Sequence, residues 1–190
     1  MLQKSIEMEN KPIVLVGLMG VGKTSLGRTL ARAMNVPFID TDLEIERVSG
    51  MSVIDIFSLY GEKEFRRIEA DVFERIINTP PLFKVISTGE GAFITPSVCK
   101  LALKQSITIW LKADLELLAK RTSWRDTRPQ LLVKNPADIL AKLMEERYPI
   151  YAKAKITIET SGESKSGTLK KIFNAIGRPE LFSPTPKRLT

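Results

Sequence analysis

The segment Gly17-Leu18-Met19-Gly20-Val21-Gly22-Lys23-Thr24 constrains this chain more than any other part of the sequence. It matches the pattern Gly-x4-Gly-Lys-Thr, in which the backbone curls around phosphate groups with its N–H groups pointing inward. A short apolar run (residues 11–17) leads into it, and apolar residues at helical spacing follow it. A structural turn would not need Lys followed by Thr at its exit. We therefore predict a phosphate-binding loop between a buried strand and a helix.

The residue types in this loop suit the binding of ATP with Mg²⁺. Gly20 and Gly22 allow the positive φ angles that a phosphate cradle needs and that side chains resist. Lys23 is expected to neutralise the β- and γ-phosphate oxygens, and Thr24 to ligate Mg²⁺, beside the positive end of the helix dipole. The nucleotide-binding residues expected in this loop are Gly20, Val21, Gly22, Lys23, Thr24 and Ser25.

Apolar runs and helical spacings alternate along the rest of the chain. Strands are expected at about residues 11–17, 38–39, 84–87, 106–111 and 156–159. Helices are expected at about residues 22–34, 113–121, 137–148 and 167–176. A further helix is expected to begin at an N-cap, Ser52, and to be interrupted at Gly61 before a second helix that runs to about residue 76. Such alternation implies right-handed crossovers and a parallel sheet covered on both faces. We predict an α/β protein with a three-layer α-β-α P-loop NTPase fold, in which a central parallel sheet carries a substrate-binding helical segment (about 43–78) and a lid (about 122–136).

The length of 190 residues is enough for one well-buried core. We expect an N-terminal extension (1–10), a single domain (11–177) and a flexible tail (178–190). No apolar run approaches the roughly 18 residues that span a bilayer, and Cys99, alone in the sequence, excludes an internal disulfide. These features are typical of a soluble cytoplasmic protein that does not bind membranes.

The charged composition narrows the possible chemistry. The chain has no histidine, which excludes His-based acid–base catalysis and His-containing metal sites. The formal net charge of +7 fits either an anionic small substrate or a nucleic acid. No aromatic–basic surface motif supports a nucleic-acid partner.

Two groups of charged residues are candidates for a second substrate. Asp40 and Asp42 end the second predicted strand, at the carboxyl edge where ligands bind in this architecture. One could hold the Mg²⁺ shell through water and the other could orient an alcohol and accept its proton, although Asp42 could instead be a helix N-cap. Arg66 and Glu69 lie three apart on one helical face, which a surface ion pair would explain equally well.

The combined order of these motifs resembles the shikimate kinase family from about residue 11 to residue 177. The resemblance rests on the loop at 17–24, Phe38-Ile39-Asp40-Thr41-Asp42, Ile56-Phe57 with Gly61-Glu62, Phe65-Arg66-Arg67-Ile68-Glu69, Arg128-Pro129 and Glu146-Arg147-Tyr148-Pro149-Ile150-Tyr151. No one motif is unique to the family, but their joint order and spacing is highly specific.

For the acceptor, the resemblance implies phosphorylation of the 3-hydroxyl of shikimate to shikimate 3-phosphate, a step towards chorismate and the aromatic amino acids. Asp42 would bind the ring hydroxyls and act as base or orienting group. Arg66 and Arg147 would meet the carboxylate, a task that suits planar guanidiniums better than lysine. The implied substrate-binding residues are Asp42, Arg66, Gly89, Glu90, Gly91 and Arg147.

For the nucleotide, the resemblance implies that Asp40 contacts Mg²⁺ through its bound water. It also implies that Arg121 stacks on adenine and that Arg128, in the lid, reaches the transferred phosphoryl group. Lys23, Asp42 and Arg128 would be the catalytic residues. The family is usually monomeric, so a monomer with ATP, Mg²⁺ and shikimate as ligands is expected. Trp124, in the same lid, could cover the nucleotide or anchor the lid by burial.

Glu90 departs from the family, which has three consecutive glycines where this chain has Gly89-Glu90-Gly91. A glutamate adds bulk, lacks glycine-only backbone angles and brings negative charge to a site for a carboxylate. Its side chain could turn outward or pair with an arginine, the protein could be impaired, or its substrate could differ. We favour the first explanation.

Two alternatives to phosphorylation of shikimate remain open from the sequence. One is a kinase for another small polyol acid such as gluconate, because a fold alone does not name a substrate. The other is a non-catalytic nucleotide-binding relative whose acceptor site Glu90 has altered. Arg66 and Arg147 argue against the first. The second is disfavoured by retention of Lys23, Asp40, Asp42 and Arg128.

Overall fold

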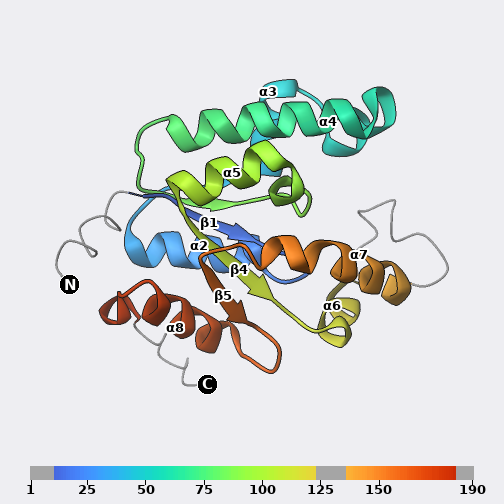
Figure 1. The fold of residues 1–190 in the computed structure, drawn as a ribbon. Helices are drawn as coiled ribbons and strands as arrows, with labels where there is room; N and C mark the ends of the chain where they lie inside the picture. Colours follow the sequence, from blue (N-terminus) through green and yellow to red (C-terminus); the bar gives the residue numbers. More distant parts are fainter. Residues whose placement is uncertain (1–10, 123–135, 183–190) are drawn as a thin grey trace, which may run out of the picture.

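A parallel five-stranded sheet lies in the middle of the molecule (Figure 1). The computed structural model describes residues 11–122 and 136–182. The strand order is β2-β3-β1-β4-β5, and all the strand pairs are parallel. The strands are β1 (Ile13–Val16), β2 (Phe38–Asp40), β3 (Val85–Ser87), β4 (Ile107–Lys112) and β5 (Ile156–Glu159). The expected parallel α/β architecture is confirmed.

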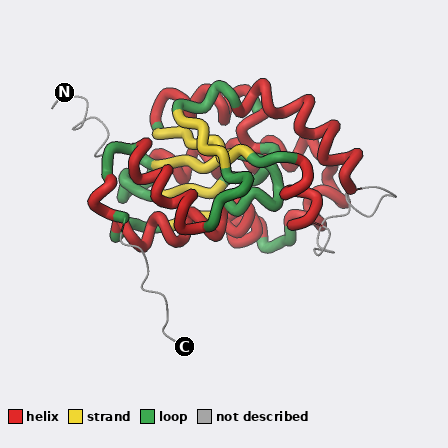
Figure 2. Tube along the Cα trace, turned by 90° about the horizontal axis from the view of Figure 1, so that it is seen from below, coloured by secondary structure: helices red, strands yellow, loops and turns green. Residues whose placement is uncertain are grey.

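Helices enclose the sheet on both faces (Figures 1 and 2). In Figure 1, α2 and α8 lie on one side of the sheet, and α5 lies on the other with α4 packed beyond it. The helices are α2 (Lys23–Met34), α3 (Thr41–Ser49), α4 (Val53–Asn78), α5 (Pro96–Gln105), α6 (Leu115–Thr122), α7 (Pro136–Tyr151) and α8 (Lys165–Ala175), with short 3-10 helices at Ala92–Ile94 and Pro179–Leu181. None of these helices has the length and apolar character needed to cross a membrane.

Strand β1 explains why the sequence begins its folded part with an unbroken apolar run. It lies between β3 and β4, and each of its residues is at most 1% exposed. Leu15 aligns with Ser87 on one side and with Ile109 on the other. A strand covered by helices on both faces has no polar side to present, so its residues do not alternate.

Local signals place the boundaries of helix α4. Ser52 is its N-cap, and its hydroxyl accepts a hydrogen bond from the Asp55 amide at 3.1 Å. Gly61 interrupts the helix with φ 78° and ψ 172°, a conformation that side chains rarely adopt. The predicted start at Ser52 and the predicted break at Gly61 are both confirmed.

Three features differ from the expectations. Asp40, rather than Asp42, is the N-cap of α3, because its carboxylate accepts from the Asp42 amide at 3.2 Å. No helix was expected around α5, whose apolar spacing is short and follows a loop. Residues beyond Gly177 were assigned to the tail, yet Phe182 packs on Phe173 with ring centroids 6.5 Å apart, so residues 178–182 pack against the core.

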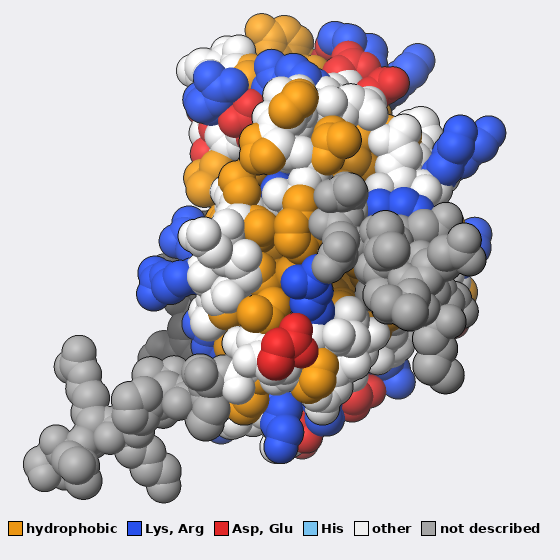
Figure 3. Space-filling model, turned by 90° about the vertical axis from the view of Figure 1, so that its left-hand side faces the viewer, with side chains coloured by type: hydrophobic (Ala, Val, Ile, Leu, Met, Phe, Trp, Pro, Cys, Tyr) orange, Lys and Arg blue, Asp and Glu red, His pale blue; other side chains and the backbone are white. Residues whose placement is uncertain are grey.

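The two ends of the sheet differ in character. The arrowheads of β1, β4 and β5 point towards one end in Figure 1, so the loops that follow the strands gather there. Figure 3 views the opposite end, where hydrophobic side chains occupy the centre and Lys and Arg side chains are scattered around them. Ligands in open parallel sheets bind beyond the carboxyl ends of the strands. We therefore expect the functional site at the end to which the arrowheads point in Figure 1.

Candidate active site

The glycine-rich loop after β1 has the backbone geometry of a phosphate cradle. Gly17, Gly20 and Gly22 have φ angles of 139°, 77° and 100°, which only glycine adopts readily. Lys23 is 9% exposed, and its ammonium donates hydrogen bonds to the carbonyl oxygens of Gly17 (2.7 Å) and Leu18 (3.0 Å). The lysine therefore lies over the loop that it would serve, at the N-terminus of α2.

Asp40 and Thr24 form a pair of hard oxygen ligands beside this loop. The Thr24 hydroxyl donates to the Asp40 carboxylate at 2.8 Å, which links the start of α2 to the end of β2. No group of three or more Asp, Glu or Cys side chains converges on a metal position within residues 11–122 and 136–182. This donor set fits Mg²⁺, which keeps several waters and uses one or two protein oxygens together with phosphates.

A cavity of about 700 Å³ adjoins this pair and is suited to an acceptor molecule. Thr24 and Asp40 contribute to its wall, so it is continuous with the expected metal position. Its lining is mixed, with aromatic and aliphatic side chains around a few converging charges. The lining residues include Asp42, Leu43, Ile54, Phe57, Phe65, Arg66, Glu69, Gly89, Glu90 and Gly91.

Arg66 is held against this cavity by neighbours on its own helix. Its guanidinium donates to Glu69 at 2.8 Å and to Glu62 at 3.2 Å, and it lies 5.2 Å from the centroid of the Phe65 ring. A Cβ atom at Gly91 would lie 2.2 Å from Arg66 Nη1, so only glycine leaves room for the arginine here. The arginine therefore has a defined position at the cavity wall.

Glu69 is a buried carboxyl rather than half of a surface ion pair. Its side chain is 1% exposed, so the surface interpretation of the Arg66–Glu69 pair is wrong. Burial raises the pKa of Glu69 to about 7, Arg66 opposes that rise, and Asp42 and Glu90 add to it. Carboxylates thus outnumber the cations that face this part of the cavity.

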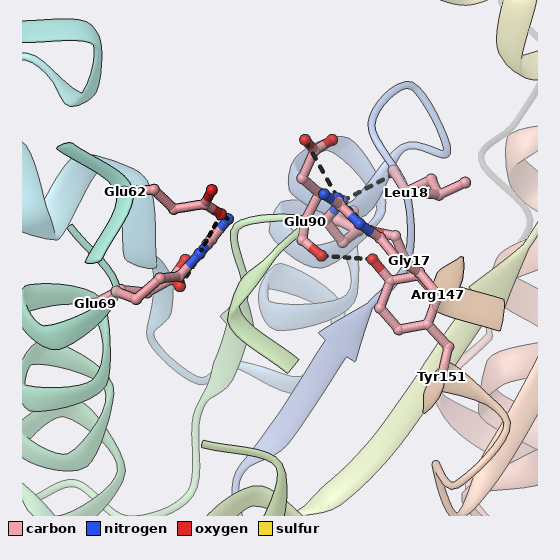
Figure 4. A network of polar contacts seen from close by, with 9 residues as sticks. Gly17, Leu18, Glu62, Glu69, Glu90, Arg147 and Tyr151 are labelled. Atoms are coloured by element: carbon pink, nitrogen blue, oxygen red, sulfur yellow. Dashed lines mark hydrogen bonds and ion pairs between the residues drawn. The ribbon is translucent and has the colours of Figure 1, made fainter. Parts of the chain in front are cut away.

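Glu90 forms an ion pair with Arg147 of α7, as the first explanation anticipated (Figure 4). Glu90 Oε1 lies 3.5 Å from Arg147 Nη1, and both side chains are about nine-tenths buried. The Glu90 carbonyl accepts a hydrogen bond of 2.5 Å from the Tyr151 hydroxyl, one helical turn after Arg147. Among the described residues other than glycine, Asn35 is the one with a positive φ angle, so the backbone at Glu90 has an ordinary conformation. The cost that we expected for a side chain at a glycine-only backbone angle therefore does not arise.

Comparison with known proteins agrees with this geometry. The profile of the family described as shikimate kinase matches residues 19–177. The chain is 45% identical over 164 residues to a shikimate kinase of Rhizobium meliloti (86% of this chain, 84% of the relative) and 41% identical over 169 residues to one of Bartonella henselae (89% and 80%). The chain belongs to the shikimate kinase family.

Solved structures of the family have the same fold. The shikimate kinase of Acinetobacter baumannii in complex with shikimate superposes with a TM-score of 0.82 at 35% identity, covering 90% of this chain and 95% of that one. A gluconokinase from Sinorhizobium meliloti gives a TM-score of 0.56 at 18% identity, which shows a shared fold alone. As a member of the shikimate kinase family, this chain is an ATP-dependent kinase.

Most of the expected site residues converge at one end of the sheet. Asp42, Arg66, Gly89, Glu90 and Gly91 line the acceptor cavity, whereas Arg147 pairs with Glu90 and is not among the described residues that line it. The expected lid residues Arg128 and Trp124 lie outside the described residues.

The nucleotide side of the loop is a separate cavity of about 370 Å³. Arg121 contributes to it, with Nη1 at 3.4 Å from the carbonyl oxygens of Gly20 and Val21, as do Gly22 and Ser25. The sequence interpretation missed four lining residues that follow β5. They are Thr160, Glu163, Lys165 and Thr168. The rule that ligands bind beyond the carboxyl ends of parallel strands could have identified this loop.

Proposed function

We propose that this chain transfers the γ-phosphoryl group of ATP to the 3-hydroxyl of shikimate and releases shikimate 3-phosphate and ADP. The observation that carries the proposal is one cavity whose wall includes Thr24, Asp42 and Arg66. It offers an oxygen ligand for a phosphate-bound cation, a carboxylate for an alcohol and a guanidinium for a carboxylate, which are the groups that a hydroxylated acid acceptor needs.

Asp42 and Arg66 have distinct tasks in this reaction. Asp42 orients the 3-hydroxyl and receives its proton as the oxygen forms a bond to the γ-phosphorus and the bond to the β-phosphate oxygen breaks. Arg66, fixed by Glu69 and by contact with Gly91, binds the acceptor carboxylate together with Arg147. Positioning of the two reactants supplies much of the catalysis.

Lys23 and its neighbours serve the nucleotide. Lys23, which now contacts the loop carbonyls, would bind the β- and γ-phosphates, and Arg121 would lie against the adenine. Thr24 and Asp40 would hold Mg²⁺, which would supply positive charge to the phosphates. Arg128 is the residue we assign to the transferred phosphoryl group.

We also infer that the enzyme works as a cytoplasmic monomer and does not bind nucleic acid or membranes. On the face in Figure 3, Lys and Arg side chains are scattered and do not form a continuous basic surface of the kind that nucleic-acid-binding proteins present. Light scattering at working concentration tests the oligomeric state.

A coupled ADP-release assay with shikimate, with gluconate and without acceptor tests the function. We expect ADP release with shikimate but not with gluconate or without an acceptor. In Asp42→Asn we expect kcat with shikimate to fall by at least about 100-fold. Asp71→Asn is the matched control, because Asp71 is an exposed carboxylate paired with Arg67. A preference for gluconate would refute the acceptor, and ATP binding without turnover on either acid would refute the kinase reaction.

A further inference from the structure

The ion pair of Glu90 and Arg147, drawn apart from Glu69 in Figure 4, differs in kind from the ion pair of Arg66 and Glu69. Arg66 and Glu69 are joined by a charge-assisted hydrogen bond of 2.8 Å, whereas Glu90 and Arg147 are separated by 3.5 Å. The longer distance exceeds that of a charge-assisted hydrogen bond. The interaction between Glu90 and Arg147 is therefore an electrostatic attraction without a short hydrogen bond. A carboxylate that lay closer to Arg147 could replace Glu90 as its partner.

Arg147 retains hydrogen-bonding capacity in a buried position. Its Nη1 atom is shielded from solvent and makes no hydrogen bond within residues 11–122 and 136–182. A buried donor without an acceptor is costly, and an incoming carboxylate oxygen would satisfy it. Glu90 lies between Arg147 and the acceptor cavity, because Glu90 lines that cavity and pairs with Arg147.

The backbone of Glu90 is anchored independently of its side chain. The Tyr151 hydroxyl donates to the Glu90 carbonyl, and Tyr151 is fully buried between Phe93 and Trp110. Rotation of the Glu90 side chain can therefore expose Arg147 without moving the loop. Asp42 and Arg66 pack on the flanking glycines, Gly89 and Gly91, rather than on the Glu90 backbone.

We propose that the Glu90 carboxylate is an internal competitor for the acceptor carboxylate on Arg147, and so determines the affinity and charge selectivity of the acceptor site. The inference rests on the proposed function, in which Arg147 binds the acceptor carboxylate. When the acceptor enters, its carboxylate displaces Glu90 from Arg147. Glu90 does not touch the reacting hydroxyl, so it acts on binding rather than on the chemical step.

Charge in the cavity sharpens the selection. Asp42, Glu69 and Glu90 are three carboxyls near the guanidiniums of Arg66 and Arg147, and a bound acid would bring a further negative charge. Like charges at close range oppose binding unless the acceptor makes better hydrogen bonds than Glu90 does. An acid whose ring also hydrogen-bonds Asp42 can meet this requirement, whereas a simple carboxylate has less to offer.

The central test compares the KM for shikimate in the parent and in Glu90→Gln, which keeps the size of the side chain and removes its charge. We expect the KM for shikimate to fall by roughly tenfold, with kcat and the KM for ATP changed by less than about twofold. Glu64→Gln is the matched control, since Glu64 is an exposed carboxylate on α4 paired with Arg67. A KM that rises in Glu90→Gln would overturn the proposal, because Glu90 would then be positioning Arg147 for the acceptor.

A double-mutant cycle and an uncharged acceptor isolate the competition. In an Arg147→Met background, Glu90→Gln should leave the KM for shikimate unchanged, and the KM for the methyl ester of shikimate should not respond to Glu90→Gln in either background. If Glu90→Gln lowered the KM for the ester as much as it lowers the KM for shikimate, the proposal would be overturned. Steric or packing changes at position 90, rather than competition between carboxylates, would then explain the effect. Melting temperatures show whether each variant is folded, and Glu90→Gly provides a second removal of the carboxylate.

Failure of the inference is distinguishable from failure of the proposed function. If the parent releases ADP in the presence of shikimate, but the KM for shikimate is the same in Glu90→Gln, the inference alone is overturned. No shikimate-dependent release by the parent or by any variant overturns both.

Discussion

At the scale of single residues, the site is organised by which charges are buried and what each one faces. Glu69 shows this most clearly, because its carboxyl is enclosed by Arg66, Asp42 and Glu90 and its pKa is raised to about 7, chiefly by burial. The same pair was compatible in the sequence with an ordinary surface contact. Burial, which depends on residues far away along the chain, decided between the two.

The raised pKa predicts a pH-dependent contribution to stability. The folded state keeps the Glu69 proton at pH values above 4.5, where the unfolded chain has released it. This contribution is fully present below pH 4.5 and is lost as pH rises through about 7. The advantage of the parent over Glu69→Gln in unfolding free energy should therefore shrink by roughly 2–3 kcal/mol between pH 5 and pH 8, as measured by urea denaturation.

The control for that experiment is Glu64→Gln. Glu64 pairs with Arg67 on the exposed side of α4, and its pKa is lowered by that hydrogen bond. Its effect on stability should be small across the same pH range. A difference between the parent and Glu69→Gln that stays constant with pH would contradict the assignment.

Gly91 is the second residue at which a small change should have a specific effect. A methyl group there would lie 2.2 Å from Arg66 Nη1, so Gly91→Ala must displace the guanidinium. We expect the KM for shikimate to rise at least about tenfold, equivalent to about 1.4 kcal/mol, while the KM for ATP stays the same. Steady-state kinetics with each substrate varied separately would measure this, and an unchanged KM for shikimate would refute it.

At the scale of elements, close packing of α2 on the sheet keeps the phosphate cradle in place. A Cβ atom at Gly27 would lie 2.6 Å from the Phe38 ring and 3.2 Å from Leu15, so the helix approaches β1 and β2 closely at this glycine. The approach sets the start of α2 next to Asp40, where Thr24 meets the end of β2. Position 27 therefore links core packing to the proposed metal and phosphate site.

Gly27→Ala is expected to destabilise the protein despite its better helix propensity. Alanine gains up to about 1 kcal/mol of propensity, but overpacking against Phe38 and Leu15 costs about 1–3 kcal/mol. Gly167→Ala in α8 is the matched control, because the nearest atom there is the mobile carboxylate of Glu163. Denaturant unfolding should show a loss for Gly27→Ala and no loss for Gly167→Ala. Equal effects would contradict the packing argument.

At the scale of the whole molecule, two cavities adjoin the same short segment, the end of the glycine-rich loop and the start of α2. The proposed acceptor cavity reaches Thr24, and the proposed nucleotide cavity reaches Gly22 and Ser25. Both cavities draw on elements that are distant in the sequence, from α4 to α8. Binding should consequently stabilise the domain as a unit.

Addition of Mg-ATP tests that coupling. At about 100 times its dissociation constant, a ligand stabilises the folded state by about 2.7 kcal/mol, which raises the melting temperature of a domain of this size by roughly 5–10 °C. We expect Mg-ATP to produce such a shift, and ATP with EDTA a smaller one, in differential scanning fluorimetry. Lys23→Met should abolish most of the shift. The same shift in Lys23→Met as in the parent would contradict the assigned role of the loop.

The sequence by itself determined the strand–loop–helix unit around residues 17–24 and the parallel sheet, because these depend on local backbone needs and on the spacing of apolar residues. The resemblance in the order of its motifs indicated the family. The sequence also predicted Asp42, Arg66 and the segment 89–91 of the acceptor cavity, but not the apolar side chains of its wall. It did not locate α5 or the nucleotide-side residues after β5, whose local patterns are weak. Tertiary structure alone decided that Asp40 caps α3, that Glu69 is buried and that Glu90 meets Arg147, since burial and pairing depend on which distant side chains share a space.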